Sequence, residues 1–97
     1  MFNIVPDEKK LIVVFSGRMD TIASMKIDNE IDIAVTHAKK PVVFDMKEVD
    51  YVSSSFLRIC VAAAKAAGKD NFSIINPQDQ ITKVLKITGL EGFIKKA

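Results

Sequence analysis

Residues 42–60 read VVFDMKEVDYVSSSFLRIC, and this stretch predicts a strand that leads into a helix. The apolar run Val42–Phe44 predicts a short strand that ends at the carboxylate of Asp45, and a polar connection is expected after it. Three serines, Ser53 to Ser55, then stand at the head of an apolar, alanine-rich run. The N-terminus of a helix carries free backbone N–H groups and the positive end of the helix dipole, which favour a negative group. The serines are therefore candidates both for a helix cap and for a phosphorylation site.

The composition is that of an ordinary folded domain. The chain has 97 residues, of which 48% are hydrophobic and 27% charged, and this predicts one domain with a single core. The lone cysteine, Cys60, allows no internal disulfide and fits a reducing compartment. No apolar run approaches the ~20 residues that a membrane-spanning helix needs. The N-terminal sequence MFNIVPDEKK is too charged for a secretory signal, so a cytoplasmic location is expected.

The first part of the chain predicts a hairpin and a helix. Apolar runs at residues 2–5 and 11–15 are separated by proline, aspartate and lysines, which is typical of a hairpin, and Gly17 is expected to break the second strand. From about Ile22 to Ala38 the apolar residues recur at three- and four-residue steps, which predicts an amphipathic helix. Asp20 or Thr21 could cap this helix.

The second part predicts two more helices and another strand. The helix beginning near Ser54 is expected to end at Gly68 and to bury one apolar stripe, made of Phe56, Leu57, Cys60, Val61, Ala64 and Ala67. A strand over 72–75 and a helix over about 78–88 follow, and residues 90–94 form a short strand or a helical turn. The order β-β-α-β-α-β-α predicts an α/β fold with a mostly parallel sheet and an antiparallel first strand.

Catalytic chemistry has little support in this sequence. His37 lies late in a predicted helix with no partner in sight, and Cys60 is expected to pack as a small hydrophobe. One histidine and one cysteine do not make a zinc site, and the isolated glycines do not make a phosphate-binding loop. Asp45 and Asp50 could form a carboxylate pair, although an aspartate at a strand end more often forms a turn. We expect no enzyme activity, no cofactor and no metal. A net charge of +2 with scattered basic residues also argues against nucleic acid as a partner.

The three serines leave two interpretations open. Serine is among the best N-cap residues, and such a cap contributes ~1 kcal/mol. Phosphorylation at the same position would add about −1.5 to −2 charges and three acceptor oxygens. Because the helix terminus would stabilise that charge, the modification could abolish binding of a partner without changing the fold.

Two motifs resemble those of a known family. Residues 45–57, DMKEVDYVSSSFL, resemble the signature of the STAS domain of bacterial anti-sigma factor antagonists, which reads roughly Asp-Leu-Ser-x-Val-x-x-Ile-Asp-Ser-Ser-Gly-Leu. Residues 17–20, GRMD, resemble the Gly-x-x-Asp that follows the second strand of that family. The order of elements also matches over essentially the whole chain. The resemblance implies one STAS domain over residues 1–97, with its helices mainly on one face of the sheet.

The resemblance also implies a function in transcription regulation. Such antagonists bind an anti-sigma factor that is also a serine kinase, and they thereby release the sigma factor. The kinase phosphorylates the first serine after the motif's aspartate, which blocks rebinding, and a serine phosphatase resets the cycle. By position, the phosphorylated residue would be Ser54, with Ser53 and Ser55 as alternatives. The residues expected to contact the partner are Asp20, Ser53, Ser55, Phe56, Arg58 and Lys65.

The sequence departs from the family signature at three positions near these serines. Ser53 replaces the aspartate before the phosphorylated serine, Phe56 replaces a glycine, and Arg58 stands where many members carry a second glycine. These departures support a second hypothesis, which is a STAS binding module without a phosphorylation cycle. A subunit of a lipid-transport ABC complex or a scaffold component would be of that kind.

Overall fold

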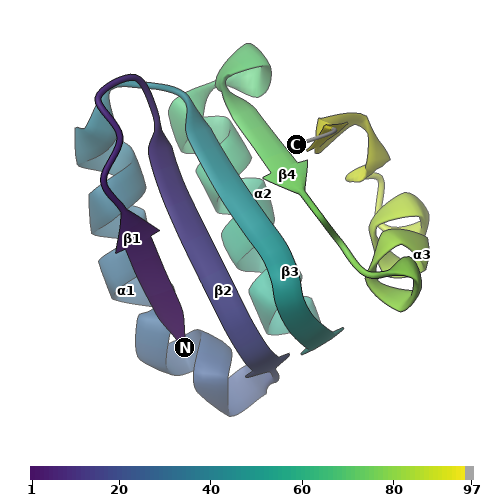
Figure 1. Ribbon diagram of the computed structural model, residues 1–97. Coiled ribbons are helices and arrows are strands. Elements are labelled where there is room, and N and C mark those ends of the chain that lie inside the picture. The colour runs from purple at the N-terminus through teal and green to yellow at the C-terminus, as the bar shows by residue number, and fades with distance from the viewer. Residues whose placement is uncertain (96–97) are drawn as a thin grey trace.

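The computed structural model describes residues 1–95, which form five strands and three α-helices (Figure 1). The elements are β1 (Phe2–Val5), β2 (Leu11–Met19), α1 (Thr21–Ala38), β3 (Val42–Val52), α2 (Ser54–Ala67), β4 (Phe72–Ile75), α3 (Asp79–Ile87) and β5 (Ile94–Lys95). Two 3-10 turns, η1 (Lys69–Asn71) and η2 (Glu91–Phe93), precede β4 and β5. Within residues 1–95 the strands lie in the order β1-β2-β3-β4-β5, and only the β1–β2 pair is antiparallel. The predicted α/β fold with its mostly parallel sheet is confirmed.

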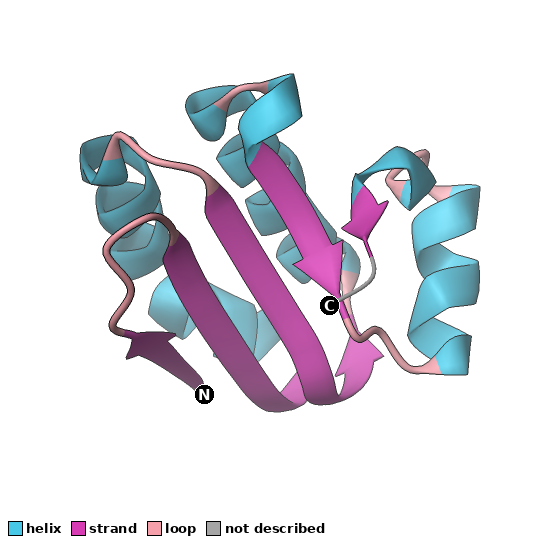
Figure 2. Ribbon diagram, turned by 45° about the horizontal axis from the view of Figure 1, so that its top comes forward, coloured by secondary structure: helices cyan, strands magenta, loops and turns pink. Residues whose placement is uncertain are grey.

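The two long helices cover one face of this sheet. In Figure 1, α1 and α2 lie side by side behind the strands, whereas α3 lies beyond β4 at the edge of the sheet. The view in Figure 2 shows the same arrangement, and no helix of the described residues covers the other face. The helices therefore lie mainly on one face, as expected. Parallel strands joined by helices put the β2–α1 and β3–α2 connections at the same end of the sheet.

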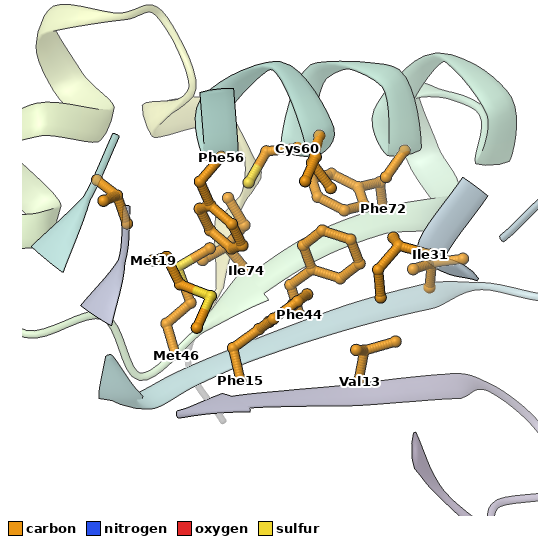
Figure 3. Packing of buried hydrophobic residues seen from close by; sticks show 14 of the residues in the cluster. Val13, Phe15, Met19, Ile31, Phe44, Met46, Phe56, Cys60, Phe72 and Ile74 are labelled. Atoms are coloured by element: carbon orange, nitrogen blue, oxygen red, sulfur yellow. The ribbon is translucent and has the colours of Figure 1, made fainter. Parts of the chain in front are cut away.

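The core lies between the sheet and these two helices. Strand β2 alternates buried and half-buried residues, with Leu11, Val13 and Phe15 facing α1 and α2. Phenylalanines of adjacent strands form a row across the sheet, in which Phe15, Phe44 and Phe72 meet edge to face at 4.8–5.0 Å between ring centroids. Figure 3 shows how these side chains fill the layer below α2. Burial of each ring contributes about 1.5–3 kcal/mol, so this row anchors the fold.

Strands β2 and β3 are both longer than the sequence predicted. Gly17 does not end β2, and residues 45–52 are strand rather than a polar connection. Along this stretch β3 advances from Asp45 to Glu48 while β2 advances only from Val14 to Ser16, and a second register shift follows after Gly17. Gly17 has a φ of 86°, which glycine adopts readily, so the strand continues through the irregularity. The two shifts place extra residues in β3 and interrupt the alternation of buried and exposed side chains by which a strand is recognised in a sequence.

The remaining elements agree with the expected order and differ in detail. Helix α1 begins at Thr21 with Asp20 as its cap, and Gly68 ends α2 as expected. The segment over 90–94 is both a helical turn and a strand, because η2 leads directly into β5. Within α2, Leu57 is only half-buried and Val61 is exposed, whereas Ile59 and Ala63, which were not predicted, are buried, so the buried stripe is rotated around the helix relative to the expected one. Leu57 and Val61 are therefore partly accessible at the surface of α2.

Candidate functional site

The candidate site is built around the start of α2, where the three serines occupy three different environments. Strand β3 ends at Val52, and Ser53 has extended backbone angles before the helix begins at Ser54. The backbone N–H of Ser53 donates to Met19 O at 2.8 Å, which fixes this turn against the end of β2. Because the turn is held by both strands, each serine has a defined position relative to the sheet.

Ser53 is the helix cap and is buried. Its Oγ accepts a hydrogen bond from the backbone N–H of Phe56 at 3.2 Å, and the residue is 8% exposed. The same Oγ lies 3.5 Å from Oγ of Ser24, a buried residue of α1. This hydroxyl pair joins the start of α2 to the first turns of α1. The capping interpretation is therefore confirmed for Ser53.

Ser54 and Ser55 follow Ser53 as the first two residues of α2. Ser54 is exposed, and Ser55 is half-buried next to α1. The first turn reads Ser54-Ser55-Phe56-Leu57 and holds no carboxylate, so no fixed charge offsets the positive end of the helix dipole from within it. Of the three hydroxyls, that of Ser54 is the most accessible and lies at the most favourable place for a negative group.

Phe56 points into the core and does not lie on the surface. Its ring is fully buried and meets Phe15 edge to face at 5.0 Å between centroids. Figure 3 shows it reaching from α2 down to the sheet beside Met19. A partner at the surface therefore finds no Phe56 ring to contact.

A second group of polar residues ends β2 beside the serines. Asp20 caps α1 by accepting a hydrogen bond from Ala23 N–H at 2.9 Å. Arg18 lies near Asp20, with Nε 3.8 Å from Oδ2, and its Cζ stacks 3.9 Å from the centroid of the Tyr51 ring. Met19 of β2 pairs with Val52 of β3 in the sheet. Asp20 and Ser53 each come directly after one of these paired residues, so both leave the sheet at the same end. The structure thus places Asp20 at the same end of the sheet as the serines.

Arg58 and Lys65 lie on the exposed side of α2 and border a surface groove. This α2–α3 groove has a volume of about 450 Å³ and runs between α2 and the segment after α3. Its lining includes Ser54, Leu57, Arg58, Val61, Lys65 and Leu90. A smaller groove of about 260 Å³, between α1 and α2, includes Met25, Ser55 and Arg58. Ser54, Arg58 and Lys65 therefore share one groove, whereas Asp20 lies outside it.

Sequence reasoning missed two sets of residues at this end of the molecule. Ser24 is buried against Ser53, although its position three residues before Ile27 on the buried stripe of α1 was a usable signal. Ile22 and Met25 of α1 are large and apolar yet 67% and 72% exposed. They fall outside the buried stripe, which indicates an apolar surface beside the serines.

The described residues show no site for a metal. Among residues 1–95, no group of three or more His, Cys, Asp or Glu side chains could hold a metal ion. Burial raises the pKa of the Cys60 thiol well above its usual range, so Cys60 remains a protonated packing residue, as expected. In the same part of the chain, no helix combines the length and the apolar character needed to cross a membrane.

The fold and this end of the sheet define the class of the protein, which is a small STAS-type α/β domain. A family model described as "Mlab, STAS domain" matches residues 4–95. The chain therefore belongs to the STAS domain family, and the resemblance stated from its sequence is confirmed.

Solved structures of anti-sigma factor antagonists have the same fold. A STAS domain protein of this kind from Planctomyces limnophilus has a TM-score of 0.85 at 17% identity, covering 99% of this chain and 87% of its own. One from Mycobacterium paratuberculosis has a TM-score of 0.82 at 22% identity, covering 99% and 83%. The Bacillus cell fate determinant SpoIIAA, solved in its phosphorylated form, has a TM-score of 0.77 at 16% identity, covering 100% and 91%. At these identities the similarity shows the fold.

Proposed function

We propose that this chain is a cytoplasmic anti-sigma factor antagonist, which binds an anti-sigma factor with serine kinase activity through the surface around the start of α2. Phosphorylation of Ser54 prevents the binding, and a serine phosphatase restores it. The observation that carries this proposal is the contrast between neighbouring serines. Ser53 is buried in the cap, and Ser54 is exposed at the end of an apolar groove.

The choice of Ser54 over Ser53 rests on access. A kinase has to bring the γ-phosphate of ATP to the serine oxygen, and the Ser53 oxygen is engaged by Phe56 N–H and enclosed next to Ser24. Ser54 presents its hydroxyl without opening the helix. Ser55 is half-buried between α1 and α2 and is reached less easily. Ser54 is thus the serine that a kinase can modify while the fold stays intact.

The effect of a phosphate at Ser54 follows from electrostatics. The dianion would lie at the positive end of the α2 dipole, with Arg58 one turn further along the helix, so the free protein tolerates it. A partner that packs against the same surface would have to bury or oppose two negative charges, and this costs several kcal/mol. Phosphorylation therefore acts on the complex and leaves the fold alone.

The proposal is tested with three variants of the chain used as bait in the native lysate. Ser54→Asp adds a charge, Ser54→Asn has nearly the same shape without it, and Ser54→Ala removes the hydroxyl. We expect Ser54→Asp to retain about tenfold less partner than Ser54→Asn, because only the charge differs. Ser54→Ala is expected to bind as well as the wild type. Mass spectrometry should identify an ATPase of the histidine-kinase type and a phosphate on Ser54 of the wild-type chain.

A second candidate function keeps the binding surface and omits the switch. A STAS module in a lipid-transport ABC complex or a scaffold would need no kinase. One observation favours it, which is that the family's aspartate before Ser54 is replaced by Ser53, whose hydroxyl is used by the cap. Recovery of an ABC-type ATPase, with Ser54 unmodified and with equal retention by Ser54→Asp and Ser54→Asn, would support this candidate and contradict the first.

A further inference from the structure

We propose that the α2–α3 groove binds an acidic amphipathic helix of the partner. Apolar residues of that helix would pack on Leu57 and Val61, above the buried Leu90, and its carboxylates would face Arg58 and Lys65. The identity of the partner rests on the proposed function. The chemistry of the bound segment rests on the groove itself, so the two can be tested separately.

The apolar part of the groove matches the repeat of a helix. Leu57 and Val61 are four residues apart on α2, which places them one turn apart along the same side. Leu90 lies at the base of the groove, where it is 4% exposed and held by a hydrogen bond from its N–H to Leu85 O. A helix lying along α2 would meet this row with side chains at positions i, i+3 and i+4.

The walls of the groove favour a partner segment whose backbone N–H and C=O groups are hydrogen-bonded within the segment itself. The α2 wall is a regular helix, whose backbone N–H and C=O groups are bonded within α2. On the other wall, the Thr88 hydroxyl donates to Val84 O and the N–H of Leu90 is already engaged. An extended segment would find few backbone partners here and would lose hydrogen bonds to water. A helix buries its side chains without that cost.

The charges at the groove select an acidic partner. Arg58 and Lys65 are exposed, seven residues apart, and therefore about 10 Å apart along α2. None of the described residues that line the groove is acidic. Glu91, which follows Leu90 in the chain, lies 3.5 Å from the ammonium group of Lys86. Arg58 and Lys65 therefore suit a partner helix that carries two carboxylates about two helical turns apart.

The position of Ser54 connects this groove to the proposed switch. Ser54 lies at the end of the groove where α2 begins, one turn before Arg58. A phosphate there would stand in the path of the acidic helix and would also compete for Arg58. The same dianion that α2 tolerates in the free protein would repel the bound helix.

The test is a site-specific photocrosslink in the native organism. A benzophenone amino acid replaces Val61 in the full chain, and a second chain carries it at Ile4, which is exposed on the opposite edge strand. We expect the Val61 probe to capture a peptide with acidic residues seven apart and apolar residues three or four apart. The Ile4 probe should not capture this peptide. In an Arg58→Glu, Lys65→Glu chain, capture at Val61 should fall about tenfold.

The outcomes separate the groove from the proposed function. An acidic helix that belongs to an anti-sigma factor supports both proposals, and one from another class of protein supports the groove while contradicting the proposed function. The groove proposal is overturned by a crosslink to a second copy of this chain or to a peptide without carboxylates, by unchanged capture after charge reversal, or by no captured peptide. Thermal unfolding of the charge-reversed chain checks that it folds, as expected for two exposed side chains.

Discussion

The starts of α1 and α2 are built alike and differ in the residue that caps them. Each helix follows a strand, and the last residues of those strands, Met19 and Val52, are paired in the sheet. The cap of α1 is Asp20, charged and half-buried, whereas the cap of α2 is Ser53, neutral and buried. The positive end of the α1 dipole therefore has a carboxylate beside it, and that of α2 has none. The neutral cap leaves α2 able to receive a negative group from outside.

The two helix starts are also anchored to different extents. The N–H bonded by the α1 cap belongs to Ala23, which is half-buried, and the N–H bonded by the α2 cap belongs to Phe56, which is fully buried. One residue of α2 thus both completes the cap and fills the core. The start of α2 is therefore anchored in the core through a larger buried side chain than the start of α1.

The largest effect is expected from the residue that anchors α2. Phe56→Ala removes a ring that packs against Phe15 and leaves a cavity, so it should lower the free energy of unfolding by about 3–5 kcal/mol. Ala23→Gly at the matching position of α1 should cost only about 1 kcal/mol. Urea denaturation of both variants measures the difference. Equal costs would show that the two starts are anchored alike.

A smaller difference is expected between the two caps. Asp20→Ala should cost about 1 kcal/mol through the lost cap. Ser53→Ala should cost about 2 kcal/mol, because it also leaves the buried Ser24 hydroxyl without its partner. The double variant Ser24→Ala, Ser53→Ala removes both hydroxyls and should recover part of the loss. If it is less stable than Ser53→Ala alone, the hydroxyl pair does not join the helices in the way described.

The smallest effect concerns added charge at the two helix starts. Ser54→Asp should stabilise the free protein by about 0.3–1 kcal/mol, since it places a carboxylate at an uncompensated helix N-terminus. Thr21→Asp, at the first residue of α1, should stabilise it less because Asp20 is already adjacent. Thermal unfolding in low salt should show this order, and about 1 M salt should remove it. The reverse order would contradict the role assigned to the neutral cap.

Much of the fold could be predicted because its helices and short strands carry clear local patterns. The apolar spacing in residues 22–38 and the glycine at position 68 gave the bounds of α1 and α2 closely. The continuation of β3 could not be predicted from the pattern. Its buried residues Met46, Val49 and Val52 recur every three positions, because extra residues in β3 shift its register against β2. That shift depends on pairing with a strand far away in the sequence.

The candidate site was predicted in part. The run of serines and the helix periodicity predicted the start of α2 and a cap among the three serines, but sequence alone could not separate a buried Ser53 from an exposed Ser54. That difference depends on Ser24, which comes from another helix. Leu57 and Val61 were expected in the core since they fall on the apolar side of α2. The groove forms because α3 lies beside the sheet, where it does not cover them (Figure 1).

The stacked pair of Arg18 and Tyr51 gives this protein a built-in optical reporter. The chain has no tryptophan, and Tyr51 is its one tyrosine. Apart from the weak emission of phenylalanine, the intrinsic ultraviolet fluorescence therefore comes from the single ring of Tyr51. Tyr51 is 40% exposed and lies two residues before Ser53, with the guanidinium of Arg18 against the face of its ring. An event that moves Arg18 or covers the ring changes the emission of the whole molecule. Unlabelled protein can therefore report occupancy of this end of the sheet in real time.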